Sequence, residues 1–185
     1  MDDLLMLFRS RFESLGGHVE PAKNVDEAAS YAGEFIRKNH AASVFVSNIP
    51  PEVEPALIRE LRVRGFRVFS KETTPDALSV IKEVDAGVSS AACGIAETGT
   101  LVEVAFDDVE RLLSSLPKVH VSFLKRSMIY RSVYSVSEVI RRAAERKTSA
   151  VTFISGPSRS GDIEQRLVLG IHGPHAVSAV VMNWL

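Results

Sequence analysis

Residues 43–70 read SVFVSNIPPEVEPALIRELRVRGFRVFS, in which two short apolar segments flank a longer amphipathic one. The opening SVFVS and the closing FRVFS combine aromatic and β-branched residues, a composition typical of buried strands. Between them, Pro50 and Pro51 interrupt the chain, and Pro55 is well placed to begin a helix over 55–64. A strand, a helix and a second strand in this order predict one building unit of a parallel α/β sheet.

The same alternation continues on both sides of this unit. Helical spacing of apolar residues, with capping residues or proline nearby, predicts helices at 2–15, 25–38, 75–82, 107–115 and 136–145. Apolar runs predict strands at 85–89, 95–105, 118–124, 150–154, 167–171 and 177–182, the second of them as paired strands around a Thr-Gly-Thr turn. We therefore expect an α/β fold with a mostly parallel, helix-covered sheet, and antiparallel strands near the C-terminus, where the helices stop.

The composition is that of an ordinary globular chain. Of the 185 residues, 45% are hydrophobic and 24% are charged, and the formal net charge is −1. This charge provides no attraction to nucleic acid or to an anionic membrane surface, so neither partner is expected. No apolar run approaches the roughly 20 residues that span a bilayer, so membrane insertion is not expected either. Without a repeat or a linker, we expect one domain over 1–185, with N-terminal helices at about 2–38.

Cys93 is the only cysteine in the chain. One thiol cannot form an internal disulfide, and it cannot supply the roughly four thiolates that hold an iron–sulfur cluster. We expect Cys93 to be a small buried side chain rather than a nucleophile. The chain begins MDDLLMLFRS, acidic where a secretory signal would be basic, so a reducing cytoplasm is the expected location.

A polar loop, SGPSRSGDIE, follows the strand predicted at 150–154. Its two glycines have P-loop spacing, but Asp162 stands where a P-loop needs lysine and would repel phosphates. Neither a dinucleotide-binding fingerprint nor a G-x-S-x-G nucleophile elbow is present. Two interpretations stay open. Ser158, Arg159 and the loop amides could bind a phosphate or carboxylate, or the loop could be a turn in which Asp162 and Gln165 cap one helical turn.

A second polar island lies within the apolar segment 95–105. Glu97 is flanked by Ile95, Ala96 and Leu101, so we expect it to be partly buried. A buried carboxylate can act as a nucleophile or as a general acid or base. The alternative is a glutamate on the polar face of an edge strand, next to a β-turn.

Histidines give weaker signals. His172 and His175 have a spacing that metal ligands can use, but they lie in a turn broken by glycine and proline. We therefore predict no metal site. His120 lies within a strand pattern and is expected to line the core.

Four motifs together carry a family resemblance, and they occur in the order AETGT (96–100), LPKVH (116–120), SGPSRSGDIE (155–164) and LGIHGP (169–174). In this order they resemble the LUD-domain family, in the lactate utilisation protein C (LutC/YkgG) group. The resemblance spans roughly 86–185 at the level of motifs, whereas the N-terminal half agrees only in layout. It implies a NagB/RpiA/CoA-transferase-like fold, which is a doubly wound α/β sheet with an antiparallel insertion.

The resemblance also implies a function and a site. It implies an accessory or small-anion-binding subunit of a system that oxidises L-lactate to pyruvate together with iron–sulfur partner proteins. Glu97 and His172 would be the candidates for proton transfer. The residues that would bind a small anionic metabolite are Thr98, Gly99, Thr100, Ser158, Arg159, Asp162, Glu164 and Gly173. No cofactor is specified. The segment 103–110, EVAFDDVE, is more acidic than the family pattern, which puts the usual ligand or partner surface in question.

Two other hypotheses are retained. The chain could be a stand-alone enzyme of the wider superfamily, acting on a sugar phosphate, a folate or an acyl-CoA, with Arg159 as a phosphate clamp. It could also be a structural or regulatory module whose polar loops are only turns. Fold alone does not choose among the three, because one fold supports many functions.

Overall fold

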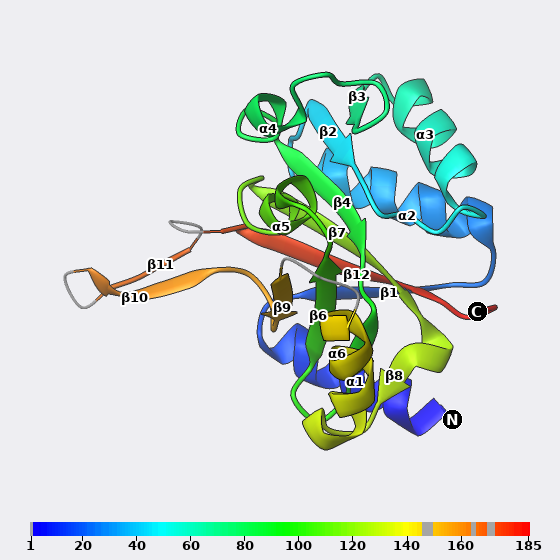
Figure 1. Ribbon diagram of the computed structural model, residues 1–185, viewed down its shortest axis with the longest axis vertical. Coiled ribbons are helices and arrows are strands. Elements are labelled where there is room, and N and C mark those ends of the chain that lie inside the picture. The colour runs from blue at the N-terminus through cyan, green and yellow to red at the C-terminus, as the bar shows by residue number, and fades with distance from the viewer. Residues whose placement is uncertain (1, 146–149, 164–165, 170–172) are drawn as a thin grey trace.

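The computed structural model describes residues 2–145, 150–163, 166–169 and 173–185. Its centre is a six-stranded sheet in the order β1-β12-β7-β4-β2-β3, in which every pairing is parallel (Figure 1). The strands are β1 (His18–Ala22), β2 (Ser43–Val46), β3 (Arg67–Ser70), β4 (Ala86–Ser90), β7 (Val119–Lys125) and β12 (Ala176–Met182).

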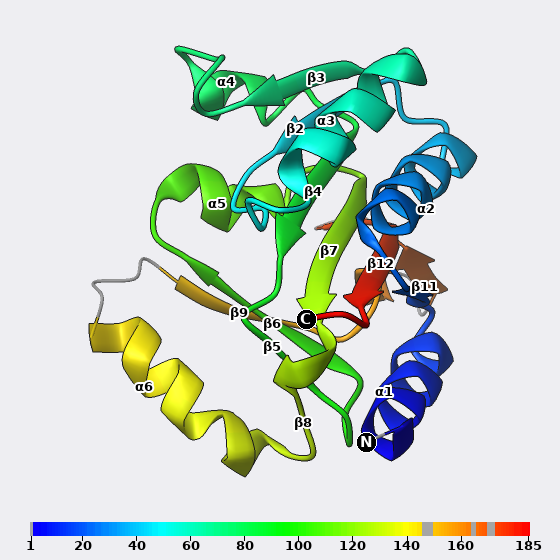
Figure 2. The same cartoon turned by 90° about the vertical axis from the view of Figure 1, so that its right-hand side faces the viewer.

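Helices cover both faces of this sheet, as alternation along the strands requires. On β2, Val44 and Val46 pack toward α2 (Val25–Lys38) and α3 (Glu54–Val63), whereas Phe45 packs on the other face with α4 (Ala77–Val80) and α5 (Asp108–Leu113). Figure 2 shows these helices on opposite sides of the strands. The sheet is therefore doubly wound, and the predicted fold class is confirmed.

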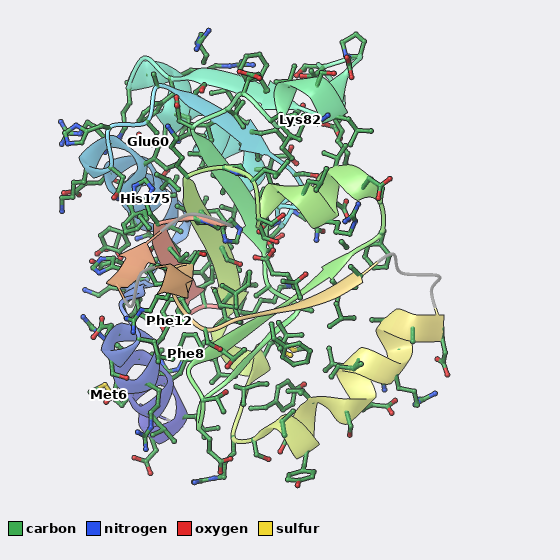
Figure 3. All side chains as sticks on the ribbon, turned by 90° about the vertical axis from the view of Figure 1, so that its left-hand side faces the viewer. Met6, Phe8, Phe12, Glu60, Lys82 and His175 are labelled. Carbon is green, nitrogen blue, oxygen red and sulfur yellow. The ribbon has the colours of Figure 1, made fainter. Side chains whose placement is uncertain are left out.

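The N-terminal helix α1 (Asp2–Ser14) lies on the same face as α5, at the other end of the sheet. Phe8 and Phe12 are fully buried and stack with their ring centroids 5.5 Å apart. Figure 3 shows both rings directed from the helix into the body of the molecule, whereas Met6 points away from it. This spacing of four residues anchors α1 to the strands beneath it.

A second, four-stranded sheet packs beside the first, in the order β8-β5-β6-β9. Its strands are β5 (Cys93–Ile95), β6 (Thr100–Ala105), β8 (Ile129–Tyr130) and β9 (Ala150–Ile154). The helix α6 (Ser137–Glu145) covers its outer face through Val139 and Ile140. As a result, every residue of β6 is buried, with the first sheet on one side and α6 on the other.

A short antiparallel pair, β10 (Arg159–Ile163) and β11 (Arg166–Leu169), projects from the body (Figure 1). The sequence pattern left open an anion-binding loop or a turn capped by Asp162 and Gln165. Residues 159–163 form the strand β10, and Gln165 lies outside the described residues. Antiparallel strands near the C-terminus are thus present, as β9, which pairs with β6, and as the pair β10 and β11. The final strand, β12, is parallel and lies between β1 and β7.

The strand β1 escaped prediction. Its sequence, HVEPA, contains a proline and a glutamate, both of which disfavour interior strands. Both residues are tolerated because β1 forms the edge of the sheet and pairs with β12 alone. None of the helices in the described ranges is long and apolar enough to cross a lipid bilayer.

Candidate functional site

Several residues that the sequence singled out meet where α1 ends. The turn 96–99 joins β5 to β6, residues 155–158 follow β9, and Gly173 precedes β12. We call this the loop cluster and define it by Thr98, Thr100, Ser155, Ser158, Arg159 and Gly173. Thr100 Oγ1 lies 2.6 Å from Thr98 Oγ1 and 2.8 Å from Ser155 Oγ. The Ser158 amide donates to the carbonyl of Pro174 over 2.8 Å. Residues from three of the four motifs are therefore brought together at the end of α1.

The loop cluster is packed closely against the end of α1. Gly99 has φ +60°, and a β-carbon there would lie 2.3 Å from the Phe12 amide nitrogen. Gly156 has φ +94°, and its β-carbon would lie 2.8 Å from the carbonyl oxygen of Leu15. The Arg159 guanidinium donates a hydrogen bond to that same carbonyl. These glycines are needed for close approach and for left-handed backbone, and the Arg159 hydrogen bond ties the end of α1 to the start of β10.

Glu97 is exposed, which corrects the expectation of partial burial. It lies in the tight turn between β5 and β6, where its amide donates to the carbonyl of Arg131 over 3.0 Å. Because Glu97 lies in the turn and not in either strand, its side chain is not buried as those of β5 and β6 are. Asp162 lies in β10, whereas Glu164 and His172 fall outside the described residues. Within the described ranges, no group of three or more His, Cys, Asp and Glu side chains could hold a metal ion.

A different site opens where the sheet changes its direction of growth. From β2 the chain adds β3 on one side, whereas from β4 it adds β7 on the other, so the switch lies between β2 and β4. Ligands of doubly wound proteins bind outside the carboxyl ends of the strands at such a point. Here a cleft of about 350 Å³ lies beside Asn48, just after β2, and Ser90, the last residue of β4. We call it the switch-point cleft.

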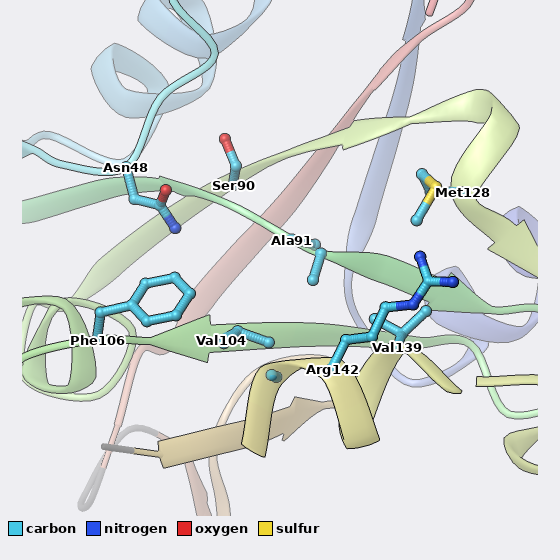
Figure 4. A pocket seen from close by; sticks show the side chains of 10 residues that line it. Asn48, Ser90, Ala91, Val104, Phe106, Met128, Val139 and Arg142 are labelled. Atoms are coloured by element: carbon cyan, nitrogen blue, oxygen red, sulfur yellow. The ribbon is translucent and has the colours of Figure 1, made fainter. Parts of the chain in front are cut away.

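The switch-point cleft has an apolar wall and a few polar groups, the usual build of a small-molecule site. Val104, Met128 and Val139 belong to the wall. In Figure 4, Asn48 lies with Phe106 at one end, and the Arg142 guanidinium lies near Met128 at the other. Arg142 Nε donates to Glu138 Oε1 over 2.9 Å, and among the described residues its other guanidinium donors have no hydrogen-bond partner, so they could bind an anion.

Asn48 has a left-handed backbone, with φ +55°. Asparagine tolerates this conformation better than most residues, but it is still uncommon outside glycine. Strained positions of this kind cluster at functional sites, so the conformation favours a role for the cleft.

Beneath the cleft lies a buried polar group that we call the buried relay, consisting of Glu103, Ser89, Ser122 and His120. Glu103 is 7% exposed and His120 is 0% exposed. Glu103 Oε1 accepts hydrogen bonds from Ser89 Oγ at 2.7 Å and from Ser122 Oγ at 2.6 Å. His120 Nε2 lies 2.9 Å from Ser89 Oγ. Two hydroxyls thus solvate a carboxylate that was removed from water.

His120 is neutral in this setting. Burial lowers the pKa of His120, and the nearby Glu103 charge only partly opposes that effect. The relay is not a serine–histidine–acid triad, because Ser89 contacts both other members and Glu103 does not bond His120 Nδ1. His120 lines the core as predicted, but it does so as part of a polar group.

The sequence analysis missed Glu103 as a site residue and noted it only within the acidic segment 103–110. A signal was present, because Glu103 interrupts the run TLVEVA, which has too few polar residues for a strand with one face in water. A charged residue in a strand buried on both faces needs an explanation.

Cys93 is buried in the apolar wall behind the cleft, where it packs with Ile95, Val102 and Val136. Burial raises the pKa of its thiol to about 11, so at neutral pH it is protonated and unreactive. This agrees with the prediction that Cys93 is a small apolar side chain.

The chain is similar in sequence to known proteins. The family model described as LUD domain matches residues 5–182. Lactate utilization protein C 1 of Bacillus mycoides is 30% identical over 191 aligned positions, which cover 98% of this chain and 80% of that protein. An uncharacterized protein of Neisseria meningitidis is 35% identical over 106 residues, covering 57% of this chain and 46% of that protein. The matched region thus spans from less than half to four-fifths of these relatives' own length.

A solved structure extends the comparison to three dimensions. The crystal structure of a DUF162 family protein from Deinococcus radiodurans has a TM-score of 0.71 and covers 98% of both chains at 20% sequence identity. At this identity the likeness establishes the fold alone.

Proposed function

The chain belongs to the LUD-domain family, and from that premise we propose that it acts in lactate utilisation as a subunit that binds a small organic anion. In this proposal it works in the cytoplasm with iron–sulfur partner proteins that oxidise L-lactate to pyruvate. The name of the Bacillus mycoides relative, which aligns along 98% of this chain, supports the lactate-related role. The substrate, the partners and the reaction are our proposals for this chain.

The single observation that carries the anion-binding part is the switch-point cleft. It lies where doubly wound folds bind ligands, it has one guanidinium, one amide and one hydroxyl around an apolar wall, and its volume of about 350 Å³ exceeds what lactate needs. Arg142 would pair with the carboxylate, since a guanidinium matches a carboxylate geometrically. Asn48 and Ser90 would fix the orientation of the ligand.

We prefer the cleft to the loop cluster as the position of the anion. In the loop cluster, Thr98, Thr100 and Ser155 bond one another, and Arg159 is bonded to Leu15. An anion there would compete with contacts that hold α1. All the predicted ligand-binding roles in and near the loop cluster stay predictions, and so do the proton-transfer roles of Glu97 and His172. The ligand-binding set is Thr98, Gly99, Thr100, Ser158, Arg159, Asp162, Glu164 and Gly173. The experiment below tests the two positions against each other.

A redox partner is proposed because the chain offers no redox group of its own among its cysteines. Cys93 is the only thiol, and it is buried and protonated at neutral pH. Oxidation of a hydroxyl to a carbonyl needs an electron acceptor, so the proposed system places that acceptor on another subunit.

The test measures binding of L-lactate, pyruvate, acetate and inorganic phosphate by isothermal titration calorimetry. We expect L-lactate or pyruvate to bind to the wild type, Arg142→Ala to lose this binding, and Arg159→Ala to retain it. Retained binding in Arg142→Ala with lost binding in Arg159→Ala would move the anion to the loop cluster. Affinity purification from cells grown on L-lactate, read out by iron content and mass spectrometry, tests the partner.

A stand-alone enzyme is the second candidate, and the buried relay favours it. A carboxylate and a neutral imidazole joined by a serine hydroxyl beneath a cleft are suitable groups for proton transfer. Turnover of a sugar phosphate, a folate or an acyl-CoA by the isolated chain would support this candidate over the subunit role.

A further inference from the structure

Phe106 is an exposed aromatic residue at one end of the switch-point cleft. It directly follows the last residue of β6, and it is 46% exposed. In Figure 4 its ring extends into the cleft, beside the Asn48 amide. The other large apolar side chains that are exposed in the described structure do not line this cleft. A single exposed ring needs no explanation on a polar surface, but here it belongs to the apolar lining of a concave site.

The Phe106 ring continues the apolar wall of the cleft along β6. Residues two apart on a strand share a face, so Phe106 extends the face on which Val102 and Val104 lie. Val102 packs with residues of α6, such as Val139. The exposed fraction then rises from 0% at Val102 to 8% at Val104 and 46% at Phe106. The cover of this face therefore ends at the cleft, where an apolar surface is left open.

The helix that follows fixes the backbone of Phe106 but does not use its ring. Asp107 is the N-cap of α5, and an apolar residue just before an N-cap often packs against the fourth residue of the helix. That residue is Arg111, whose guanidinium binds Asp108. The Phe106 amide donates to Glu110 Oε2 over 2.8 Å, which holds the backbone. The ring is thus mounted on an ordered backbone, so a ligand that packs on it does not have to order the chain first.

The charge of the cleft limits the kind of ligand that it can hold. Among the described residues that line it, Arg142 is the only charged one, and Asn48 and Ser90 are the only other polar ones. A ligand with one carboxylate and an apolar body matches this lining, because further charges would lose water without gaining a partner. The carboxylate belongs at the Arg142 end, and the apolar body belongs along the wall that leads to Phe106.

The volume of the cleft allows such a body. It is about 350 Å³, within the range of about 300–1,000 Å³ that is usual for sites of drug-sized molecules, which are much larger than lactate. Between the two ends the lining includes Ala91, whose small side chain leaves room for a flat group (Figure 4). Lactate, with a methyl group as its side chain, would leave the Phe106 end unfilled.

We propose that Phe106 forms a subsite for an aromatic ring, and that the ligand of the cleft is a 2-hydroxy or 2-oxo monocarboxylate with an aromatic side chain. The carboxylate pairs with Arg142, and the ring packs against the ring of Phe106. Two aromatic rings in offset or edge-to-face contact gain stability beyond the apolar area that they bury. This inference rests on the proposed function for the position of the carboxylate, and it enlarges the expected substrate.

The test compares L-lactate with L-3-phenyllactate by isothermal titration calorimetry. The two acids share the carboxylate and the hydroxyl and differ only by the phenyl ring. We expect the wild type to bind L-3-phenyllactate at least about tenfold more tightly, because the ring leaves water. L-3-Cyclohexyllactate, which has an apolar ring without a π face, should bind less tightly than L-3-phenyllactate. The proposal is overturned if L-3-phenyllactate binds no more tightly than either of the other two acids.

Variants assign the preference to Phe106. Phe106→Ala should lower the ratio of the affinities for L-3-phenyllactate and L-lactate by about fivefold or more. The ratio is the informative quantity, since a general disturbance at Arg142 would weaken both acids alike. Phe153→Ala is the matched control, because Phe153 is 48% exposed and lies outside the cleft lining, and it should keep the ratio of the wild type. An unchanged ratio in Phe106→Ala, or an equal decrease in both variants, overturns the proposal.

The outcomes separate this inference from the proposed function. If L-3-phenyllactate binds and neither L-lactate nor pyruvate does, the lactate role falls and the aromatic subsite stands. If L-lactate binds and the phenyl ring adds nothing, the subsite falls and the lactate role stands. If none of these acids binds to the wild type, both fall. Should Phe106→Ala not fold, Phe106→Leu takes its place, and an unchanged ratio in that variant overturns the subsite.

Discussion

The loop cluster and the switch-point cleft lie at opposite ends of β6 and use their polar residues differently. Thr100 is the first residue of β6 and belongs to the loop cluster. Phe106, which follows the last residue of β6, lines the cleft. At about 3.3 Å per residue the two ends of this strand are about 17 Å apart. In the loop cluster, hydroxyls bond each other and an arginine holds a helix end. At the cleft, the Ser90 hydroxyl has no hydrogen-bond partner within the described ranges, and an arginine has spare donors.

The contrast indicates that a recognisable motif and a binding site can lie in different parts of one molecule. The loop cluster contains residues of three of the four motifs that carry the family resemblance, yet its described contacts hold α1 in place. The cleft was not signalled by any motif. The following predictions separate a packing role from a binding role.

The largest effect is expected from a β-carbon at the loop cluster. Gly99→Ala puts a methyl group 2.3 Å from the Phe12 amide in a backbone with φ +60°, so turn and helix must separate. We expect a loss of about 3 kcal/mol or more in the free energy of unfolding, measured by urea denaturation.

Gly65→Ala is the matched control, because Gly65 has φ +84° and a β-carbon there would meet nothing within 4 Å. It should cost only the backbone strain, about 1 kcal/mol. Equal losses in the two variants would show that the loop cluster is not packed closely on α1.

The second prediction contrasts two arginines. At 100 times its dissociation constant, a ligand of the cleft should stabilise the wild type by about 2.7 kcal/mol. Arg142→Ala should abolish this stabilisation and leave the free protein almost unchanged. Arg159→Ala should cost the free protein about 1 kcal/mol, through its bond to Leu15, and keep the stabilisation.

Thermal unfolding with and without L-lactate or pyruvate measures both effects. If both arginine variants lower the stability of the free protein and both lose the stabilisation by ligand, the two regions do not differ in the way described.

The third prediction concerns pH and the buried relay. The pKa of His120 is lowered in the folded protein by burial, so below a pH of about 6.5 the unfolded chain binds a proton that the folded chain excludes. Stability should therefore fall as the pH drops below about 6.5, by at most about 1.4 kcal/mol per pH unit. His120→Gln should flatten this dependence.

Urea denaturation between about pH 7 and 5 tests this. Asp85 does not interfere, because hydrogen bonds from Ala42 and Ser43 outweigh burial and lower its pKa, so it titrates below this window. A wild-type stability that does not change over the window would contradict a buried neutral imidazole.

The last prediction concerns the chemical reactivity of Cys93 and not the stability of the fold. With a thiol pKa of about 11, roughly one molecule in a thousand is ionised at pH 8, and the side chain is buried as well. Iodoacetamide should label Cys93 in the folded protein at least about a hundredfold more slowly than in urea. Rapid labelling of the folded protein would mean that the wall behind the cleft opens.

Much of the fold could be predicted from local patterns. The helix at Val25–Lys38 was predicted with the bounds that the structure has, because its apolar spacing and its cap at Asn24 are both local. The antiparallel pair around Thr98–Thr100 followed from alternation and a glycine turn. The strand β1 could not be predicted, since its tolerance of Pro21 depends on its place at the sheet edge.

Less of the candidate site could be predicted from the sequence. The motifs marked Thr98, Thr100, Ser158, Arg159 and Gly173 as ligand-binding candidates, and the structure brings these residues together where α1 ends. The order of the motifs along the chain does not predict that α1 packs against these residues. Burial of Glu97 was wrong and burial of Glu103 was missed, because both depend on which elements cover each face of β6.

Local patterns and motifs in the sequence were enough to predict the α/β class, most of the helices and strands and the family, and to show that the chain lacks the thiols for an iron–sulfur cluster. These follow from periodicity, turn chemistry and composition, which act over a few residues at a time. The position of the cleft and the arrangement of the buried relay became known only from the three-dimensional structure. Each of these depends on strand order across the sheet, where residues distant in the chain are brought into one low-dielectric space.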